Sequence, residues 1–144
     1  MLDLPLEVGV QKLVRELCRA HLLQSAHDVS EGGLAVALAE CATTAPRAEL
    51  DRGADVKVMA HGEGPLSVVA GFFGEAPTRI VLTARRADVP RILENAEAAG
   101  VPCDELGVVG GPDLRLRAGA ATYVLPVAAL RDARERCLEP IVGA

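Results

Sequence analysis

The chain has 144 residues, half of them apolar and 24% charged, with a formal net charge of −5 and a mean hydropathy of +0.25. This apolar content excludes a disordered chain, and the acidic balance with only 2% aromatic residues argues against nucleic acid or an anionic membrane as a partner. The sequence has no apolar run of about 20 residues and no secretory signal, so we expect a single cytoplasmic domain spanning residues 1–144.

The first helix is predicted from Leu4 to Leu23, where apolar residues recur at helical spacing with charged residues between them. Asp3 and Pro5 at its start are typical of a first helical turn. The apolar positions that carry the pattern are Leu6, Val10, Leu13, Val14 and Leu17. The next segment, QSAHDVS, is too short and mixed for a helix, and we interpret it as a strand leading into a loop.

Two adjacent glycines, Gly32 and Gly33, stand at the start of the second predicted helix. Ser30 is placed to cap this helix, which we expect from Glu31 to about Cys41. Its inner face is predicted to carry Leu34, Ala37, Leu38 and Cys41. A glycine inside a helix costs about 1 kcal/mol relative to alanine. The pair therefore predicts a tight turn, a close helix contact or a backbone that approaches a ligand.

The rest of the chain alternates between short strands and helices. Strands are predicted at AELD, ADVKV, RIVLTA, LGVVGG and DLRLRAG, the first two on either side of a turn at Arg52–Gly53. Helices are predicted at Pro65–Phe73, at Asp88–Ala99 with Gly100 as the stop, and from about Pro126 to Cys137. Val108 to Pro112 is interpreted as a hairpin turn. This order of elements describes an α/β or α+β fold with helices packed on one sheet.

The segment from Ser30 to Gly33 is the first candidate site. At a strand-to-helix junction, backbone N–H groups and the helix dipole favour an anion, and glycine lets phosphate oxygens come close to the backbone. Ser30 could add a hydroxyl donor, whereas Glu31 counts against a bare phosphate cradle. Tight packing of the helix against the sheet would explain Gly32 and Gly33 equally well. The residues alone leave both interpretations open.

His27 and Asp28 precede this loop. Asp28 could orient His27 or accept hydrogen bonds from backbone N–H groups of the loop, as Asp often does before a turn. A structural role is the favoured interpretation, because one histidine beside one carboxylate does not make a metal site. His21 and His61 have no partners at a useful spacing, and we expect both to be ordinary surface or loop residues.

The second candidate site comprises Gly74, Glu75 and Arg79, in the segment FFGEAPTR. An arginine at the start of a strand can bind a phosphate through two parallel hydrogen bonds. The alternative is a surface ion pair between Glu75 and Arg79, which would contribute little to stability. We find no catalytic residue: the chain has no serine nucleophile elbow, phosphate-binding loop of the Walker type, HExxH or paired CxxC motif.

The four cysteines are far apart in the sequence, at Cys18, Cys41, Cys103 and Cys137. The first two and the last fall inside predicted helices, where a free cysteine behaves as a small buried apolar residue. We therefore expect neither disulfides nor a zinc site, as is usual for a reduced compartment.

Two motifs in this order, SAHDVSEGGLAVALAE and FFGEAPTRIVLT, resemble the C-terminal domain shared by the aminoimidazole ribonucleotide synthase superfamily. Within it they most resemble the last such domain of the phosphoribosylformylglycinamidine synthase (PurL) family. The resemblance in element order extends over almost the whole chain. It implies a fold with helices on one face of a mixed sheet of about four main strands.

The resemblance also implies a reaction. Enzymes of this family convert formylglycinamide ribonucleotide to formylglycinamidine ribonucleotide with ATP, Mg²⁺ and ammonia from glutamine, in purine biosynthesis. Carried onto this chain, Ser30, Glu31, Gly32 and Gly33 would form a loop facing the substrate, supported by His27 and Asp28. Gly74, Glu75 and Arg79 would approach the ribonucleotide from the neighbouring turn.

The expected partners in the family are an ATP-binding domain N-terminal to this one and a glutaminase subunit or domain. Neither lies in residues 1–144, so we expect this chain to be inactive by itself and to hold neither ATP nor Mg²⁺ alone. Many relatives carry serine directly after the glutamate of the second motif, where this chain has Ala76. That departure weakens the assignment of the turn to substrate binding.

Two alternatives remain open. The chain could be the equivalent domain of another superfamily member, such as selenide water dikinase, thiamine monophosphate kinase or a hydrogenase maturation protein. It could also be a stand-alone, non-catalytic module that binds a phosphorylated metabolite.

Overall fold

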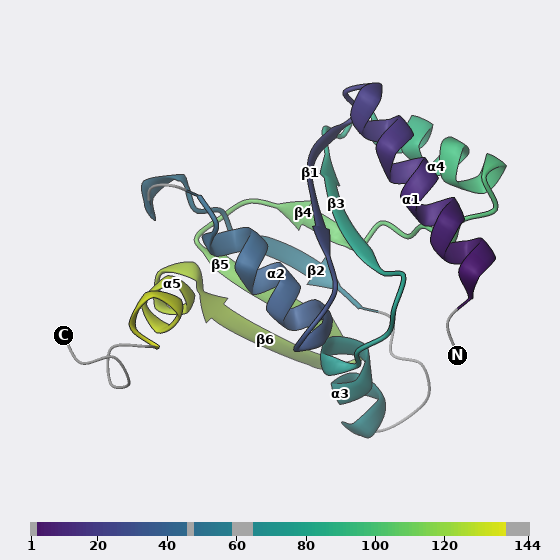
Figure 1. The fold of residues 1–144 in the computed structure, drawn as a ribbon. Helices are drawn as coiled ribbons and strands as arrows, with labels where there is room; N and C mark the ends of the chain where they lie inside the picture. The colour runs from purple at the N-terminus through teal and green to yellow at the C-terminus, as the bar shows by residue number, and fades with distance from the viewer. Residues whose placement is uncertain (1–2, 46–47, 59–64, 138–144) are drawn as a thin grey trace. The chain divides into compact units, whose positions relative to one another are not determined.

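A computed structural model describes residues 3–45, 48–58 and 65–137, and its elements are labelled in Figure 1. The chain folds as two compact units, each built from two stretches of sequence. Unit 1 comprises residues 1–31 and 75–105, and unit 2 comprises residues 32–74 and 106–144. His61 lies outside the described residues.

Unit 1 pairs two helices with a two-stranded sheet (Figure 1). The helices are α1 (Leu4–Arg19) and α4 (Val89–Ala98), and the strands are β1 (Leu23–Asp28) and β3 (Ile80–Ala84), which run antiparallel. As predicted, α1 begins with the Asp3 side chain accepting a hydrogen bond from the Leu6 N–H at 3.1 Å. It ends four residues before the predicted end at Leu23, which belongs to β1.

The core of unit 1 lies where the apolar stripes of α1 and α4 meet. Its buried members are Val10, Leu13, Leu17, Leu22, Ile92, Ala96 and Val101. Apolar residues of both strands, among them Leu23 and Ile80, pack against this cluster. The helical periodicity of the sequence therefore becomes a single apolar seam between α1 and α4.

Unit 2 is built on a four-stranded sheet with the order β4-β2-β5-β6. The strands are β2 (Ala54–Lys57), β4 (Gly107–Val109), β5 (Asp113–Ala118) and β6 (Ala121–Pro126). β2 and β5 are parallel and the other two pairs are antiparallel, so the predicted mixed sheet is confirmed. The helices of this unit are α2 (Gly33–Thr43), α3 (Pro65–Phe73) and α5 (Val127–Arg136), with a 3₁₀ turn at Ala48–Leu50.

The alternation in DLRLRAG orients the central strand β5. Leu114 and Leu116 are 0% and 4% exposed, on the face covered by α2, whereas Arg115 and Arg117 are exposed on the other face. Arg117 pairs with Asp55 of the neighbouring strand β2 at 2.7 Å. The charged face of the sheet thus carries ion pairs, and the apolar face carries the core of unit 2.

Three sequence predictions for unit 2 are wrong. AELD forms a 3₁₀ turn rather than a strand. Arg131 of α5 binds the Asp51 carboxylate, and this contact, not pairing with a neighbouring strand, fixes the segment. The run ATYVLP forms strand β6, which was not predicted. The segment around Gly110 is no hairpin, because β2 lies between β4 and β5 and Gly53 exchanges hydrogen bonds with this segment.

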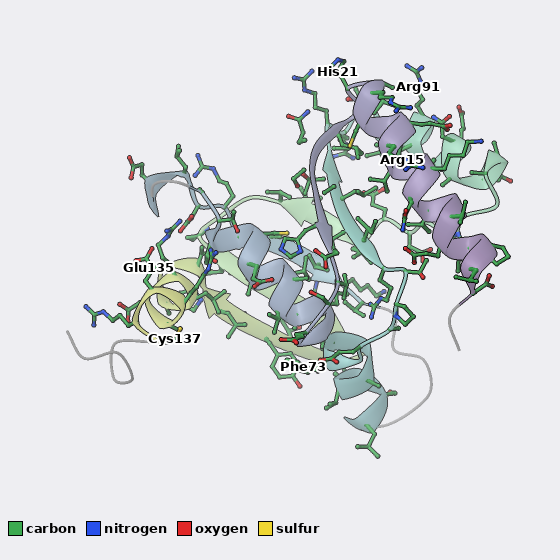
Figure 2. All side chains as sticks on the ribbon, viewed as in Figure 1. Arg15, His21, Phe73, Arg91, Glu135 and Cys137 are labelled. Carbon is green, nitrogen blue, oxygen red and sulfur yellow. The ribbon has the colours of Figure 1, made fainter. Side chains whose placement is uncertain are left out.

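The expected burial of the cysteines is also partly wrong. Cys18 and Cys137 are exposed and only Cys41 is partly buried, while all four thiols are free. Cys137 follows the last turn of α5 (Figure 2), and its thiol lies 3.2 Å from the Arg134 carbonyl. The helical pattern predicted the elements, but it did not predict that Cys18 and Cys137 would be exposed.

Candidate functional site

The glycine pair forms the start of α2, but not in the way the sequence predicted. The helix begins at Gly33 with Gly32 as its N-cap, and no side chain caps it. Ser30 is therefore not the cap, which corrects the prediction of a helix beginning at Glu31. Gly32 and Gly33 both adopt left-handed backbone conformations, with φ of 78° and 68°. Such conformations explain why glycine is required at both positions.

Gly33 is also required for close packing inside unit 2. A Cβ atom at this position would lie 2.8 Å from the Phe72 carbonyl oxygen and 2.9 Å from the Phe73 Cα. The first turn of α2 therefore rests directly on the C-terminal end of α3. Gly74 follows at that end, where its N–H donates to the Ala70 carbonyl at 2.9 Å. Two of the predicted segments, at Gly33 and before Gly74, thus come together in unit 2.

In unit 1 the segment before the glycines lies beside the start of β3. The Val29 N–H donates to the Arg79 carbonyl at 2.9 Å, and Asp28 pairs with Ile80 across the two strands. Arg79 is partly buried, and Glu75, in the loop before it, is exposed. The structure therefore brings Arg79 next to the residue that precedes Ser30. Ser30 and Glu31 themselves are exposed.

His27 contacts the backbone of its neighbour more closely than its carboxylate. The His27 Nδ1 lies 2.6 Å from the Asp28 carbonyl oxygen and 3.9 Å from Asp28 Oδ1. The Asp28 side chain is 76% exposed. This arrangement places both residues at the end of β1, where the chain leaves the strand toward the glycines.

Thr78 is not among the predicted site residues, and it adopts φ of 68° although it is β-branched. Its hydroxyl donates a hydrogen bond to the Glu7 carboxylate of α1. That bond, and a second one from the Gln11 amide, lower the pKa of Glu7 below its ordinary value. Thr78 directly precedes Arg79, so the strained residue sets the path by which the chain enters β3. No motif in the sequence signals it.

The predicted site residues are divided between the two units. His27, Asp28, Ser30, Glu31, Glu75 and Arg79 belong to unit 1, and Gly32, Gly33 and Gly74 belong to unit 2. The chain passes from one unit to the other at Glu31–Gly32 and at Gly74–Glu75. Both predicted segments thus contain a crossing point of the chain.

A metal centre is not formed by the described residues. Over residues 3–45, 48–58 and 65–137, no group of three or more His, Cys, Asp or Glu side chains could hold a metal ion. Among the same residues, none of the helices has the length and apolar character to cross a membrane.

Residues 1–118 match the family described as AIR synthase related protein, C-terminal domain. The chain is 39% identical over 133 residues to the phosphoribosylformylglycinamidine synthase subunit PurL of Anaeromyxobacter dehalogenans strain 2CP-C, covering 91% of this chain and 18% of that subunit. It is 39% identical over 131 residues to PurL of Methylocella silvestris, covering 87% of this chain and 16% of the relative. The chain thus spans less than a fifth of the length of these relatives.

Solved structures share the fold. The structure of PurLQS from Thermotoga maritima gives a TM-score of 0.74 at 21% identity, covering 91% of this chain and 22% of that one. Thermotoga maritima PurL complexed with FGAR gives a TM-score of 0.71 at 21% identity, covering 87% of this chain and 21% of that one. Other structures of the same protein are complexes with ADP and with ATP.

Proposed function

The chain belongs to the family of AIR synthase related protein C-terminal domains, and from this premise we propose that it is the C-terminal substrate-binding domain of a phosphoribosylformylglycinamidine synthase. The reaction of that enzyme would be the ATP-dependent conversion of formylglycinamide ribonucleotide to formylglycinamidine ribonucleotide in purine biosynthesis. The observation that carries the proposal is the identity of 38–39% to PurL subunits over 87–91% of the chain.

The glycine loop supports a role in binding the substrate phosphate. The N-terminus of α2 carries no side-chain cap and no acidic residue in its first turn. Backbone N–H groups at such a terminus, together with the helix dipole, favour a bound anion. Gly32 and Gly33, which the left-handed backbone requires, have no side chains that would cover these groups. Ser30 and Glu31 would flank the phosphate, with His27 and Asp28 supporting the loop.

The second segment would contribute a cation. Arg79 follows the strained Thr78 and its carbonyl is held by the Val29 N–H, so its backbone is fixed at both sides. A guanidinium at this position could bind a phosphate through two N–H groups. Gly74 and Glu75 would form the turn that leads to it.

The remaining parts of the proposed enzyme would lie outside this chain. ATP and Mg²⁺ would bind to a separate ATP-binding domain, and ammonia would come from a glutaminase subunit or domain. The chain by itself would therefore bind ribonucleotide weakly and catalyse nothing. A cytoplasmic location belongs to the same proposal.

Ribonucleotide binding can be tested by following backbone amide signals of the isotopically labelled chain during titration with formylglycinamide ribonucleotide. We expect shifts at residues 30–34 and at Arg79, and none at Gly110 and Gly111, two glycines with positive φ in a different turn. Arg79→Gln should weaken the effect, whereas Arg86→Gln, an exposed arginine beyond the other end of β3, should not. An intact fold without shifts at residues 30–34 would mean that the glycines serve packing alone.

The dependence on other domains has a separate test. The chain is incubated with formylglycinamide ribonucleotide, ATP, Mg²⁺ and ammonia, and product is measured. We expect none. Turnover at a rate near that of a full-length PurL would contradict the proposal that the chain needs other domains for activity.

A further inference from the structure

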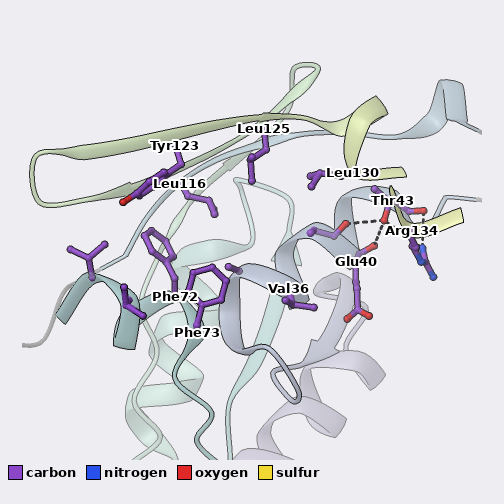
Figure 3. Close-up of a pocket in the computed structure, with 14 residues that line it drawn as sticks. Val36, Glu40, Thr43, Phe72, Phe73, Leu116, Tyr123, Leu125, Leu130 and Arg134 are labelled. Carbon is purple, nitrogen blue, oxygen red and sulfur yellow. Dashed lines mark hydrogen bonds between the residues drawn. The ribbon is translucent and has the colours of Figure 1, made fainter. Parts of the chain in front are cut away.

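Unit 2 contains a cavity of about 580 Å³ that the proposed function does not use (Figure 3). It lies along α2, from Ala35 near the start of the helix to Thr43 at its end. At 1.5 Å per residue these positions are about 12 Å apart, so the cavity is elongated. Its volume lies within the range of about 300–1,000 Å³ that is usual for small-molecule sites.

The cavity exists because the helices that the structure describes leave part of the inner face of β6 exposed. Tyr123 and Leu125 pair with Leu116 and Leu114 of β5, so all four side chains point to the face on which α2 packs. The two β5 leucines are buried, but Tyr123 and Leu125 are 51% and 38% exposed. An apolar stretch of sheet thus remains uncovered beside α2.

The walls are apolar and partly aromatic. Phe72 of α3 contacts Tyr123 edge-to-face, with ring centroids 6.2 Å apart and an interplanar angle of 88°. Val36, Leu125 and Leu130 line the stretch beyond this pair (Figure 3). Such walls would bind an alkyl chain or ring, and they do not match a ribonucleotide, whose surface is polar.

One cation lies at the end of the cavity opposite Phe72 and Tyr123 (Figure 3). Arg134 Nη1 donates to the Thr43 carbonyl at 3.0 Å and approaches Thr43 Oγ1 at 3.4 Å. Among the described residues, its Nε and Nη2 groups form no hydrogen bond, although the Asp51 carboxylate lies close enough to interact with the guanidinium electrostatically. A guanidinium held on one side is prepared to bind a carboxylate with the other.

We propose that this cavity binds an elongated apolar carboxylate of the medium-chain fatty-acid class. The carboxylate pairs with Arg134, and the alkyl chain lies along α2 and ends against Phe72 and Tyr123. Glu40 lines the same end of the cavity and has an interaction of its own. Its negative charge opposes the ligand, so it limits affinity. None of the residues that line the cavity belongs to the proposed ribonucleotide site.

Decanoate is the probe, and binding to the full chain is followed by shifts of methyl and amide signals. We expect saturable shifts at Ala35, Ala39 and Leu125. Decanol should bind about tenfold more weakly, because it lacks the charge-assisted hydrogen bonds to Arg134. Arg134→Gln should remove this difference, whereas Arg136→Gln, an exposed arginine of the same helix, should keep it. Glu40→Gln should strengthen decanoate binding.

The location is tested by filling the cavity. Leu125→Trp should abolish decanoate binding, whereas Val124→Trp, on the opposite face of the same strand, should leave it unchanged. Ala39→Leu fills the cavity from α2 and is the second blocking variant if Leu125→Trp does not fold. The proposal is wrong if decanoate does not bind, if decanol binds as tightly, or if Val124→Trp blocks binding as well as a folded cavity-filling variant does. A groove that rejects decanoate would instead be a surface for another polypeptide segment.

Discussion

At the scale of single residues, the least expected feature is the backbone of Thr78. A β-branched residue with φ of 68° is a true outlier, and such strain persists only where surrounding contacts hold it. The contact here is the hydrogen bond from its hydroxyl to Glu7, which ties the loop before β3 to the first turn of α1. Both ends of this contact lie in unit 1.

The strain can be measured by comparing two variants. Thr78→Ala and Thr78→Gly both lose the hydroxyl, but only glycine accepts the positive φ without cost. We expect Thr78→Gly to be more stable than Thr78→Ala by about 1 kcal/mol, measured by urea unfolding. Equal stability of the two variants would mean that the residue does not keep this conformation in solution.

The same contact predicts a pH dependence. The hydrogen bonds from Thr78 and Gln11 lower the pKa of Glu7 in the folded state. A lowered folded pKa contributes stability that is present above the unfolded value of about 4.3 and is lost as the pH falls through the folded value. Thr78→Ala should therefore raise the pKa of Glu7, measured from its carboxyl carbon shift, and reduce the loss of stability on acidification. An unchanged pKa would show that the bond is absent.

At the scale of elements, both helices of unit 1 end in the same way. After α1, the Leu22 N–H donates to the Leu17 carbonyl and the His21 N–H to that of Cys18. After α4, Val101 and Gly100 make the equivalent bonds to Ala96 and Glu97. These are Schellman motifs, which place one residue in the left-handed region and bury the next against the helix. The left-handed residue is His21 (Figure 2) in one case and Gly100 in the other.

The two ends form a matched pair for mutation. His21→Gly should stabilise the protein by about 0.5–1 kcal/mol, because glycine adopts the left-handed conformation freely. Gly100→His should destabilise it by a similar amount, since a Cβ at Gly100 meets no atom within 4 Å and only the conformational cost changes. Thermal unfolding of the two variants provides the measurement. Opposite signs are expected, and a loss of stability in His21→Gly would contradict the motif.

Elements were predictable where one periodicity dominates. The helical spacing in α1 and α4 and the strict alternation in β5 have a single interpretation, and the structure confirms all three. β6 was not predicted because no turn residues separate it clearly from its neighbours. It begins two residues after Gly119, and the last helix begins directly after it. The 3₁₀ turn at Ala48–Leu50 was not predictable, because it depends on Arg131 binding Asp51 from 80 residues away.

At the scale of the whole molecule, the chain passes between its two units three times, and two of these passages lie in the segments that carry the predicted site. The motifs around Gly32 and Gly74 indicated a structural or functional role for these segments. Adjacent glycines at a helix start and an arginine at a strand entrance are unusual enough to predict one. Their division between units 1 and 2 was not visible in the sequence. Sequence periodicity describes single elements, whereas the division depends on which elements share a core.

The sequence by itself determined the family, the mixed sheet with helices on one face, and the need for glycine at the start of α2. Local patterns suffice for these features, since side-chain periodicity and backbone conformation depend on neighbours along the chain. Only the tertiary structure decided that Gly33 rests on the end of α3, that Thr78 is held by Glu7, and that the inner face of β6 stays partly exposed. Each of these features joins residues far apart in sequence, and no local propensity encodes such contacts.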